Sequence, residues 1–346
     1  MRRVAVAVLA CLGLVVTGCS MTSKPQATPT AQTAATTVVP SVCKRPRYAD
    51  VVGTRPATRT HRLDRYPNDR ASCAGIWLPR INDGFVPQGL ALDRGTAWVS
   101  GWTKTNTTYK HQICQLIQID LKTGKLLRYA RLIKGYVGRL GPTVCRHGDG
   151  VDVTSQGVWV TETDRIWLLD PRRVGKSRMI KRSWRIVDPL RGAVATIHDG
   201  QYGMATFDPT QKARVDWFSI DDLMARGAIQ LVETGQPDTW RDVPGIRTET
   251  IPSKVQGMTV DAKGRLNLAR STSRCAGLVV GERTLGFLPG AEDFEYDGDG
   301  SLWALSETAS LKVLSGGDNR PLVPSLVRFD VSKLMKGHRS RCTRNW

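Results

Sequence analysis

The sequence predicts an all-β fold, a β-propeller, and three observations lead to this fold class. Between residues 76 and 332, short runs rich in Val, Ile, Leu, Thr and Trp alternate with Asp/Gly turns, as strands do. Helical periodicity is scarce there, and we expect only short helices at 220–227 and 331–336. A unit of two strands recurs five times, with a mean spacing of 51 residues between Gly89 and Asp293. Such recurrence is typical of propeller blades.

Each repeat opens with a polar residue, usually followed by Gly, and leads through an apolar strand and an Asp/Gly turn into a second strand. The openings are Gln88-Gly89, Asp149-Gly150, Arg191-Gly192, Gln256-Gly257 and Glu292-Asp293. Third strands are expected at 115–121, 165–170, 215–220, 277–280 and 325–331. Hairpin signals at 122–125 and 281–282 predict two fourth strands. In the second strands, Trp98, Trp159 and Trp303 are expected at equivalent places, packed between neighbouring blades.

The two ends of the repeat region complement each other. The last repeat lacks a fourth strand, and the apolar segment 76–79 precedes the first repeat without an inner strand of its own. We expect this N-terminal strand to complete the last blade and close the ring, which removes exposed edges. Five blades are visible. A degenerate sixth blade within 43–85 or 225–252 is an open alternative, and a β-sandwich is the alternative architecture.

The N-terminus predicts export and anchoring. Residues 1–18 contain Arg2 and Arg3, a short apolar run and Gly18, and the segment ending at Cys19 resembles a bacterial lipobox. That resemblance implies lipidation of Cys19 and a location outside the cytoplasm, anchored to the cell membrane. An ordinary cleaved signal is the alternative. Residues 19–42 are rich in Thr, Ala and Pro and predict a disordered tether, and residues 43–346 predict one propeller domain.

Cysteine usage agrees with export. After Cys11 and Cys19 are set aside, six cysteines remain, and an even set outside the cytoplasm predicts up to three disulfides. The six are Cys43, Cys73, Cys114, Cys145, Cys275 and Cys342. The strand order favours a Cys114–Cys145 bond, and we expect Cys43–Cys342 where the chain closes, which leaves Cys73–Cys275. Free buried thiols are the alternative.

The repeats also resemble a known superfamily. The segments from Pro87-Gln88-Gly89 to Trp98-Val99 and from Glu292-Asp293 to Leu302-Trp303 carry the likeness. It is to the β-propeller superfamily of the gluconolactonase and senescence-marker-type hydrolases, the NHL-repeat proteins and the streptogramin lyases. The resemblance covers residues 86–331 and implies the fold. No motif matches one member's catalytic set, so no functional residue is transferred.

The openings of the repeats are the candidate site, because inner strands of a propeller begin at one mouth of its channel. The candidates are Gln88, Asp149, Arg191, Gln256 and Glu292. Three alternatives are open for these five residues. They bind a ligand or partner, or they pair with one another and seal the channel. In the third, Asp149 and Glu292 hold Ca²⁺ for a metal-assisted hydrolase or lyase. His147 lies two residues before Asp149 and is a candidate base. Enzymatic activity is left open, binding is favoured, and no cofactor is predicted beyond the Ca²⁺ of the enzyme alternative.

The charge balance indicates anionic partners. Lys and Arg number 50 against 31 Asp and Glu, a net charge of +19, with basic runs at 172–185 and 332–339. Such a charge attracts anions over long distances, so we expect anionic lipid or a cell-wall polymer near an anchored domain. Nucleic acid is not expected, since no binding motif is present.

An apolar content of 40% suffices for a core, and beyond the N-terminus no apolar run is long enough for a polytopic membrane protein. Oligomeric state is left open.

Overall fold

The computed structural model describes residues 43–57, 60–104, 112–137, 140–272, 275–310, 321–340 and 342. The predicted signal peptide, Cys19 and the tether, which together span residues 1–42, lie outside the described residues.

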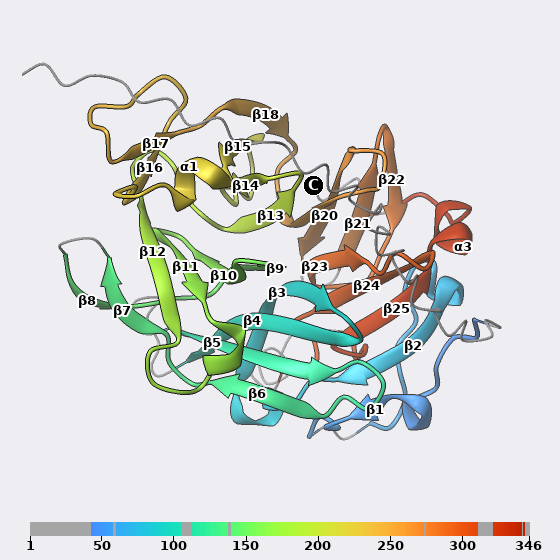
Figure 1. The fold of residues 1–346 in the computed structure, drawn as a ribbon. Coiled ribbons are helices and arrows are strands. Elements are labelled where there is room, and N and C mark those ends of the chain that lie inside the picture. The colour runs from blue at the N-terminus through green and yellow to red at the C-terminus, as the bar shows by residue number, and fades with distance from the viewer. Residues whose placement is uncertain are drawn as a thin grey trace, which may run out of the picture. The chain divides into compact units, whose positions relative to one another are not determined.

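Five sheets form the blades of a β-propeller (Figure 1). Each sheet has one inner strand: β3 (Phe85–Asp93), β9 (Gly150–Thr154), β13 (Val194–His198), β19 (Val255–Val260) and β23 (Ala291–Tyr296). These five strands contact one another in that order, and β23 contacts β3 again. From each inner strand the sheet continues outward through a second and a third strand in chain order. The predicted all-β propeller is therefore confirmed, and its described part contains five blades.

The first three blades have these strands. Blade 1 contains β3 (Phe85–Asp93), β4 (Thr96–Lys104), β5 (Gln112–Asp120) and β6 (Leu126–Ala130). Blade 2 contains β9 (Gly150–Thr154), β10 (Gly157–Glu162), β11 (Arg165–Leu169) and β12 (Ile180–Ile186), extended in parallel by β16 (Gln230–Val232) and β17 (Asp242–Pro244). Blade 3 contains β13 (Val194–His198), β14 (Gln201–Ala205), β15 (Ala213–Ser219) and β18 (Arg247–Ile251).

The other elements complete the ring and decorate it. Blade 4 contains β19 (Val255–Val260), β20 (Leu266–Thr272), β21 (Cys275–Val280) and β22 (Arg283–Gly286). Blade 5 contains β23 (Ala291–Tyr296), β24 (Ser301–Ser306), β25 (Leu326–Asp330), β2 (Ser72–Trp77) and β1 (Val52–Gly53). A separate hairpin joins β7 (Lys134–Val137) to β8 (Leu140–Val144). Short 3-10 turns occur at Tyr48–Asp50, Asp69–Ala71, Ile81–Asp83 and Pro171–Arg173.

Two short helices continue from third strands, as predicted. They are α1 (Ile220–Met224) and α3 (Val331–Met335). The side chain of Ser219 accepts a hydrogen bond from the Asp222 amide at 3.2 Å, and Asp330 accepts one from the Lys333 amide at 3.1 Å. These N-caps satisfy amides that lack a partner within the helix, which explains why each helix starts where its strand ends.

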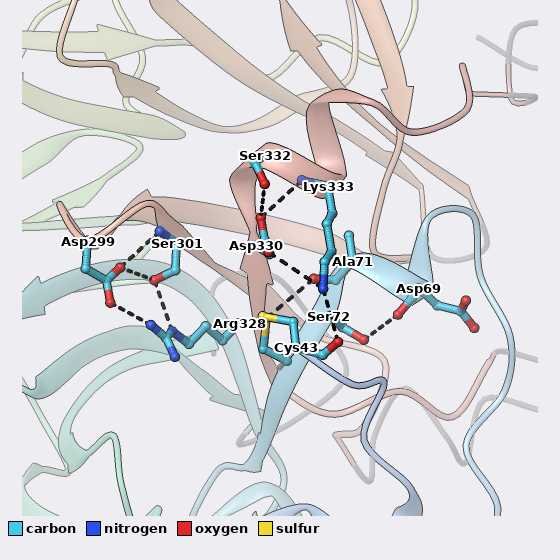
Figure 2. The surroundings of a disulfide bond; sticks show 11 residues. Cys43, Asp69, Ala71, Ser72, Asp299, Ser301, Arg328, Asp330, Ser332 and Lys333 are labelled. Atoms are coloured by element: carbon cyan, nitrogen blue, oxygen red, sulfur yellow. Dashed lines mark hydrogen bonds and ion pairs between the residues drawn. A yellow bond between two sulfur atoms is a disulfide. The ribbon is translucent and has the colours of Figure 1, made fainter. Parts of the chain in front are cut away.

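The N-terminal strand closes the ring. β2 pairs antiparallel with β25, with Ile76 opposite Leu326, so blade 5 combines both ends of the domain. Figure 2 shows this region, where the Lys333 ammonium group donates to the Cys43 carbonyl at 3.2 Å. The predicted closure is confirmed. The segments in which a sixth blade was an alternative instead add β1 and β2 to blade 5, β16 and β17 to blade 2, and β18 to blade 3.

Three disulfides join the six cysteines, and one predicted pair is confirmed. Cys114 of β5 bonds to Cys145, the residue directly after the β7–β8 hairpin. The expected pairs Cys43–Cys342 and Cys73–Cys275 are wrong, because the bonds are Cys43–Cys73 and Cys275–Cys342. The reason is the path of the C-terminal segment, which runs along blade 4 after α3. The Ser340 amide donates to the Thr284 carbonyl at 2.9 Å, and this pairing brings Cys342 to the start of β21.

The core lies between the blades. Trp98 is buried with Val151 of blade 2, Trp159 with Tyr202 of blade 3, and Trp303 with Leu90 of blade 1. Each Trp is on the second strand of its blade and packs against the next sheet around the ring. The predicted equivalence of the three tryptophans is confirmed, and burial of such large side chains contributes strongly to stability.

Candidate functional site

The polar residues that open the five repeats lie together on one pocket at the end of the channel, which we call the mouth pocket. Its volume is about 470 Å³, and Gln88, Asp149, Arg191, Gln256 and Glu292 all line it. The repeat pattern predicts these five residues at one mouth, and the structure brings them together. His147, Thr163, Gly192, Ala193, Thr206 and Phe207 complete the lining.

Three of these residues reach the pocket by the same backbone device. In β3, β19 and β23 the register with the second strand shifts at Gln88, at Gln256 and at Glu292, so each is the extra residue of a β-bulge. A bulge bends the strand and redirects one side chain. Three blades therefore aim an amide or carboxyl group at the mouth, although the residues on either side follow the ordinary alternation.

The glycines after the bulges allow the inner strands to approach closely. A Cβ atom on Gly89 would lie 2.6 Å from the Val151 amide nitrogen of the next blade, and one on Gly257 would lie 2.6 Å from the Asp293 Cα atom. Neither distance is tolerated by a real side chain. The repeated glycine thus sets the width of the ring, and with it the size of the mouth pocket.

Asp149 and Arg191 lie just before inner strands and are held by local contacts. The Asp149 amide donates to the Thr161 carbonyl at 2.9 Å, and its carboxylate contacts the Nδ1 atom of His147. The His147 ring stacks on Trp102 with a centroid distance of 5.4 Å. Arg191 forms ion pairs with Asp164 at 3.3 Å and with Asp188 at 2.5 Å. Neither aspartate is one of the five residues that open the repeats.

Glu292 is a buried acid that tends to remain protonated. Its residue is 4% exposed, and burial, with Glu307 and Asp149 nearby, raises its pKa well above the ordinary value. The Gln256 amide donates to one oxygen at 3.0 Å. Of the expected pairings within the ring, this is the one that the described residues show. A neutral carboxyl group can donate and accept hydrogen bonds at the same site.

Further carboxyl groups on the inner strands join neighbouring blades. Asp293 accepts a hydrogen bond from the Leu90 amide of blade 1 at 2.8 Å, and Asp152 accepts one from the Ile197 amide of blade 3 at 2.5 Å. Burial raises the pKa of Asp152 to about 7 and the pKa of Asp293 and Glu295 well above their ordinary values. The repeat pattern did not predict these acids as site residues. The available signal was a carboxylate within strands that otherwise read as apolar.

The predicted metal candidates, Asp149 and Glu292, share the mouth pocket. In the part of the chain that the structure describes, no group of three or more His, Cys, Asp or Glu residues is arranged to hold a metal ion. The donors themselves fit a cation poorly, because Asp149 already contacts His147 and the raised pKa of Glu292 favours its neutral form.

The disulfides bear on location. Bonds of this kind form and persist in oxidising compartments, so three of them indicate an extracytoplasmic protein. Among the described residues, no helix is long and apolar enough to cross a membrane.

Comparisons with known proteins give remote likenesses to solved structures. No protein-family model and no curated protein matches the sequence. Among solved structures, the PQQ-bound aldose sugar dehydrogenase of Streptomyces coelicolor is 12% identical, with 71% of this chain and 94% of that chain covered and a TM-score of 0.35. A protein of unknown function from Bacteroides caccae is 11% identical, with 75% and 84% covered and a TM-score of 0.39. A luciferin-regenerating enzyme is 10% identical, with 70% and 90% covered and a TM-score of 0.33.

Likenesses this remote carry no argument about activity, substrate or cofactor. The order and contacts of the five sheets identify the fold independently. The propeller fold therefore rests on the described sheets themselves.

Proposed function

We propose that this chain is an exported, membrane-anchored lipoprotein whose propeller binds a small, hydroxyl-rich ligand of the sugar class in the mouth pocket. One observation carries the proposal: a single pocket gathers the polar residues that open all five repeats. A concave pocket of this size with a few convergent polar groups is the usual form of a small-molecule site.

The chemistry of the lining favours hydroxyl groups as partners. Gln88, Gln256, Thr163 and Thr206 can each donate and accept, and neutral Glu292 can do the same. Phe207 adds an exposed aromatic face.

Saturation-transfer NMR with a panel of free hexoses, pentoses and N-acetylhexosamines tests the proposal. At least one sugar should give a signal with the purified protein. The double variant Gln88→Ala/Gln256→Ala should bind that sugar at least about tenfold more weakly, because each lost hydrogen bond contributes about 1 kcal/mol. The control Gln211→Ala/Gln236→Ala changes two exposed glutamines and should bind normally. Absence of any signal, or equal loss in both variants, contradicts a sugar site at the mouth.

The anchor has its own test. Cys19→Ala should release the protein from the membrane fraction or block its maturation, because lipidation of Cys19 is the predicted attachment. Cell fractionation at high salt, with an immunoblot for processing, measures this. A variant that matures normally and stays in the membrane fraction contradicts the lipoprotein proposal and leaves the sugar proposal untouched.

The enzyme alternative, a metal-assisted hydrolase or lyase, is favoured by the contact between His147 and Asp149 in the mouth pocket. A carboxylate that orients a histidine ring suits general base chemistry. The Ca²⁺ of this alternative has weaker support, because Asp149 already contacts His147 and the raised pKa of Glu292 favours its neutral form. Elemental analysis of the purified protein decides: stoichiometric Ca²⁺ whose removal lowers the unfolding temperature supports the alternative, and metal-free protein of unchanged stability contradicts it.

A further inference from the structure

A second hollow is lined by residues of β7, of β12 and the loop before it, and of the segment that follows α1. Figure 1 labels β7, β12 and α1. The volume of the hollow is about 720 Å³. Four cationic side chains line it, those of Lys134, Arg178, Lys181 and Arg182, and its lining contains no Asp or Glu. We call it the basic groove.

The groove is held in shape by contacts of the hairpin with blade 2. Gly135 packs so closely that a Cβ atom there would lie 2.5 Å from the Cδ1 atom of Ile180. The Ser183 hydroxyl donates to the Tyr136 carbonyl at 2.7 Å. The Cys114–Cys145 disulfide fixes the chain directly after β8. Since both walls are tied together, a ligand can bind without first ordering them, which lowers the entropic cost of binding.

The cations of the groove are not neutralised by carboxylates. Arg182 donates to the carbonyls of Met224 at 2.7 Å and Ala228 at 2.8 Å, and its guanidinium lies 5.1 Å from the centre of the Trp184 ring. Lys134, Arg178 and Lys181 are exposed. None of the four forms an ion pair with another described residue, whereas many arginines elsewhere, such as Arg214 and Arg265, do. The groove therefore has an uncompensated positive potential.

We propose that the basic groove binds a linear phosphate polyanion of the cell envelope. Its cations come from three separate segments, β7, the loop before β12 and β12 itself, so several phosphates are needed to meet them. A flexible chain can enter a groove, whereas a flat bilayer cannot. Tyr136, which is 70% exposed, is the sole aromatic residue in the lining, so successive bases of a nucleic acid would find no stacking platform. This site is separate from the mouth pocket and does not depend on its ligand.

Calorimetric titration of the full chain with long-chain linear sodium polyphosphate tests the proposal. The variant K134E/R178E/K181E should bind at least about tenfold more weakly than the unchanged protein, because three exposed attractions become repulsions. The matched control K122E/K125E/K263E makes the same change in net charge on exposed turns of blades 1 and 4 and should stay within about threefold. If the first variant unfolds, K134Q/R178Q/K181Q replaces it, with K122Q/K125Q/K263Q as its control. The groove variant should again bind polyphosphate more weakly than the control.

Four results would overturn the proposal. The first is a failure of the unchanged protein to bind polyphosphate. The second is an equal loss of binding in both charge variants, which would mean that net charge alone is responsible. The third is displacement of the polymer by orthophosphate at equal phosphate concentration, which would indicate a site for one anion. The fourth is a groove variant that binds polyphosphate as well as the unchanged protein but has lost binding to phosphatidylglycerol vesicles or to single-stranded oligothymidylate. This result would make a membrane or a nucleic acid the partner.

Discussion

Burial decides the charge of individual side chains in this protein, and Glu162 at the end of β10 shows how. Its carboxyl accepts hydrogen bonds from the Arg146 amide at 2.7 Å, from Arg165 at 3.1 Å and from the Trp167 indole at 3.2 Å. These donors favour the charged form. Burial outweighs them and raises the pKa of Glu162 to about 7.

This raised pKa predicts a pH dependence of stability. In the unfolded chain Glu162 loses its proton near its ordinary pKa of 4.5, whereas the folded protein keeps it up to about pH 7. The folded state then holds more protons, so stability falls as pH rises through this window, by up to about 3 kcal/mol for this residue. Urea unfolding measures the free energy of unfolding at about pH 4.5 and about pH 7.5. The difference between the two values should be smaller for Glu162→Gln than for the unchanged protein. An unchanged difference contradicts the assignment.

The tryptophans between blades lead to a second prediction for single residues. Trp159 is fully buried and stacks on Trp184 with a centroid distance of 5.3 Å. Trp159→Ala should lower the free energy of unfolding by about 3–5 kcal/mol, because it leaves a large cavity. Trp240 is 74% exposed, and Trp240→Ala should cost roughly 0.5 kcal/mol or less. Chemical denaturation measures both, and similar losses would mean that Trp159 does not occupy the core between blades.

At the level of elements, the close approach of the inner strands is the main constraint. Gly89→Ala should destabilise the protein by about 2–3 kcal/mol, because the new methyl group meets the backbone of β9. Gly141→Ala, where a Cβ atom would have no neighbour within 4 Å, is the control and should change little. Thermal unfolding compares them. If Gly89→Ala is as stable as the control, the ring is wider than described.

Some elements are predictable from the sequence and others are not, for physical reasons. Inner, second and third strands are apolar and bounded by Gly or Asp turns, so local pattern suffices. β12 and β18 escape prediction because they lie on the outer side of their blades and carry charged residues such as Arg182 and Glu249. The bulges at Gln88, Gln256 and Glu292 depend on register with a partner strand, which no single segment encodes.

For the candidate site, the repeat positions predict the five residues that open the repeats, but not Thr163, Thr206 or Phe207, which also line the mouth pocket. The disulfides are harder, because Cys342 is placed by the backbone pairing of the C-terminal segment with blade 4 rather than by the order of the blades. The basic groove depends on a hairpin inserted between blades 1 and 2, and the sequence repeat does not include it.

For the whole molecule, closure of the ring by β2 is the step that joins both ends of the domain. Cys73 lies within β2, and its bond to Cys43 closes a segment with a sequence separation of 30 residues. Cys43→Ser/Cys73→Ser should lower the free energy of unfolding by about 3 kcal/mol, since the unfolded chain gains freedom. Calorimetry of the double variant measures this. A variant as stable as the unchanged protein would mean that this bond does not contribute to closure.

Five blades, closed by β2, bring polar residues together at the mouth pocket, which we propose binds a sugar. The most direct test is a crystal structure of the protein grown with whichever sugar of the panel binds. We predict sugar hydroxyl groups within hydrogen-bonding distance of Gln88, Gln256 and Glu292 in the mouth pocket. A sugar bound elsewhere on the molecule would contradict the mouth pocket as its site, and a ring in which β2 does not pair with β25 would contradict closure by the N-terminal strand.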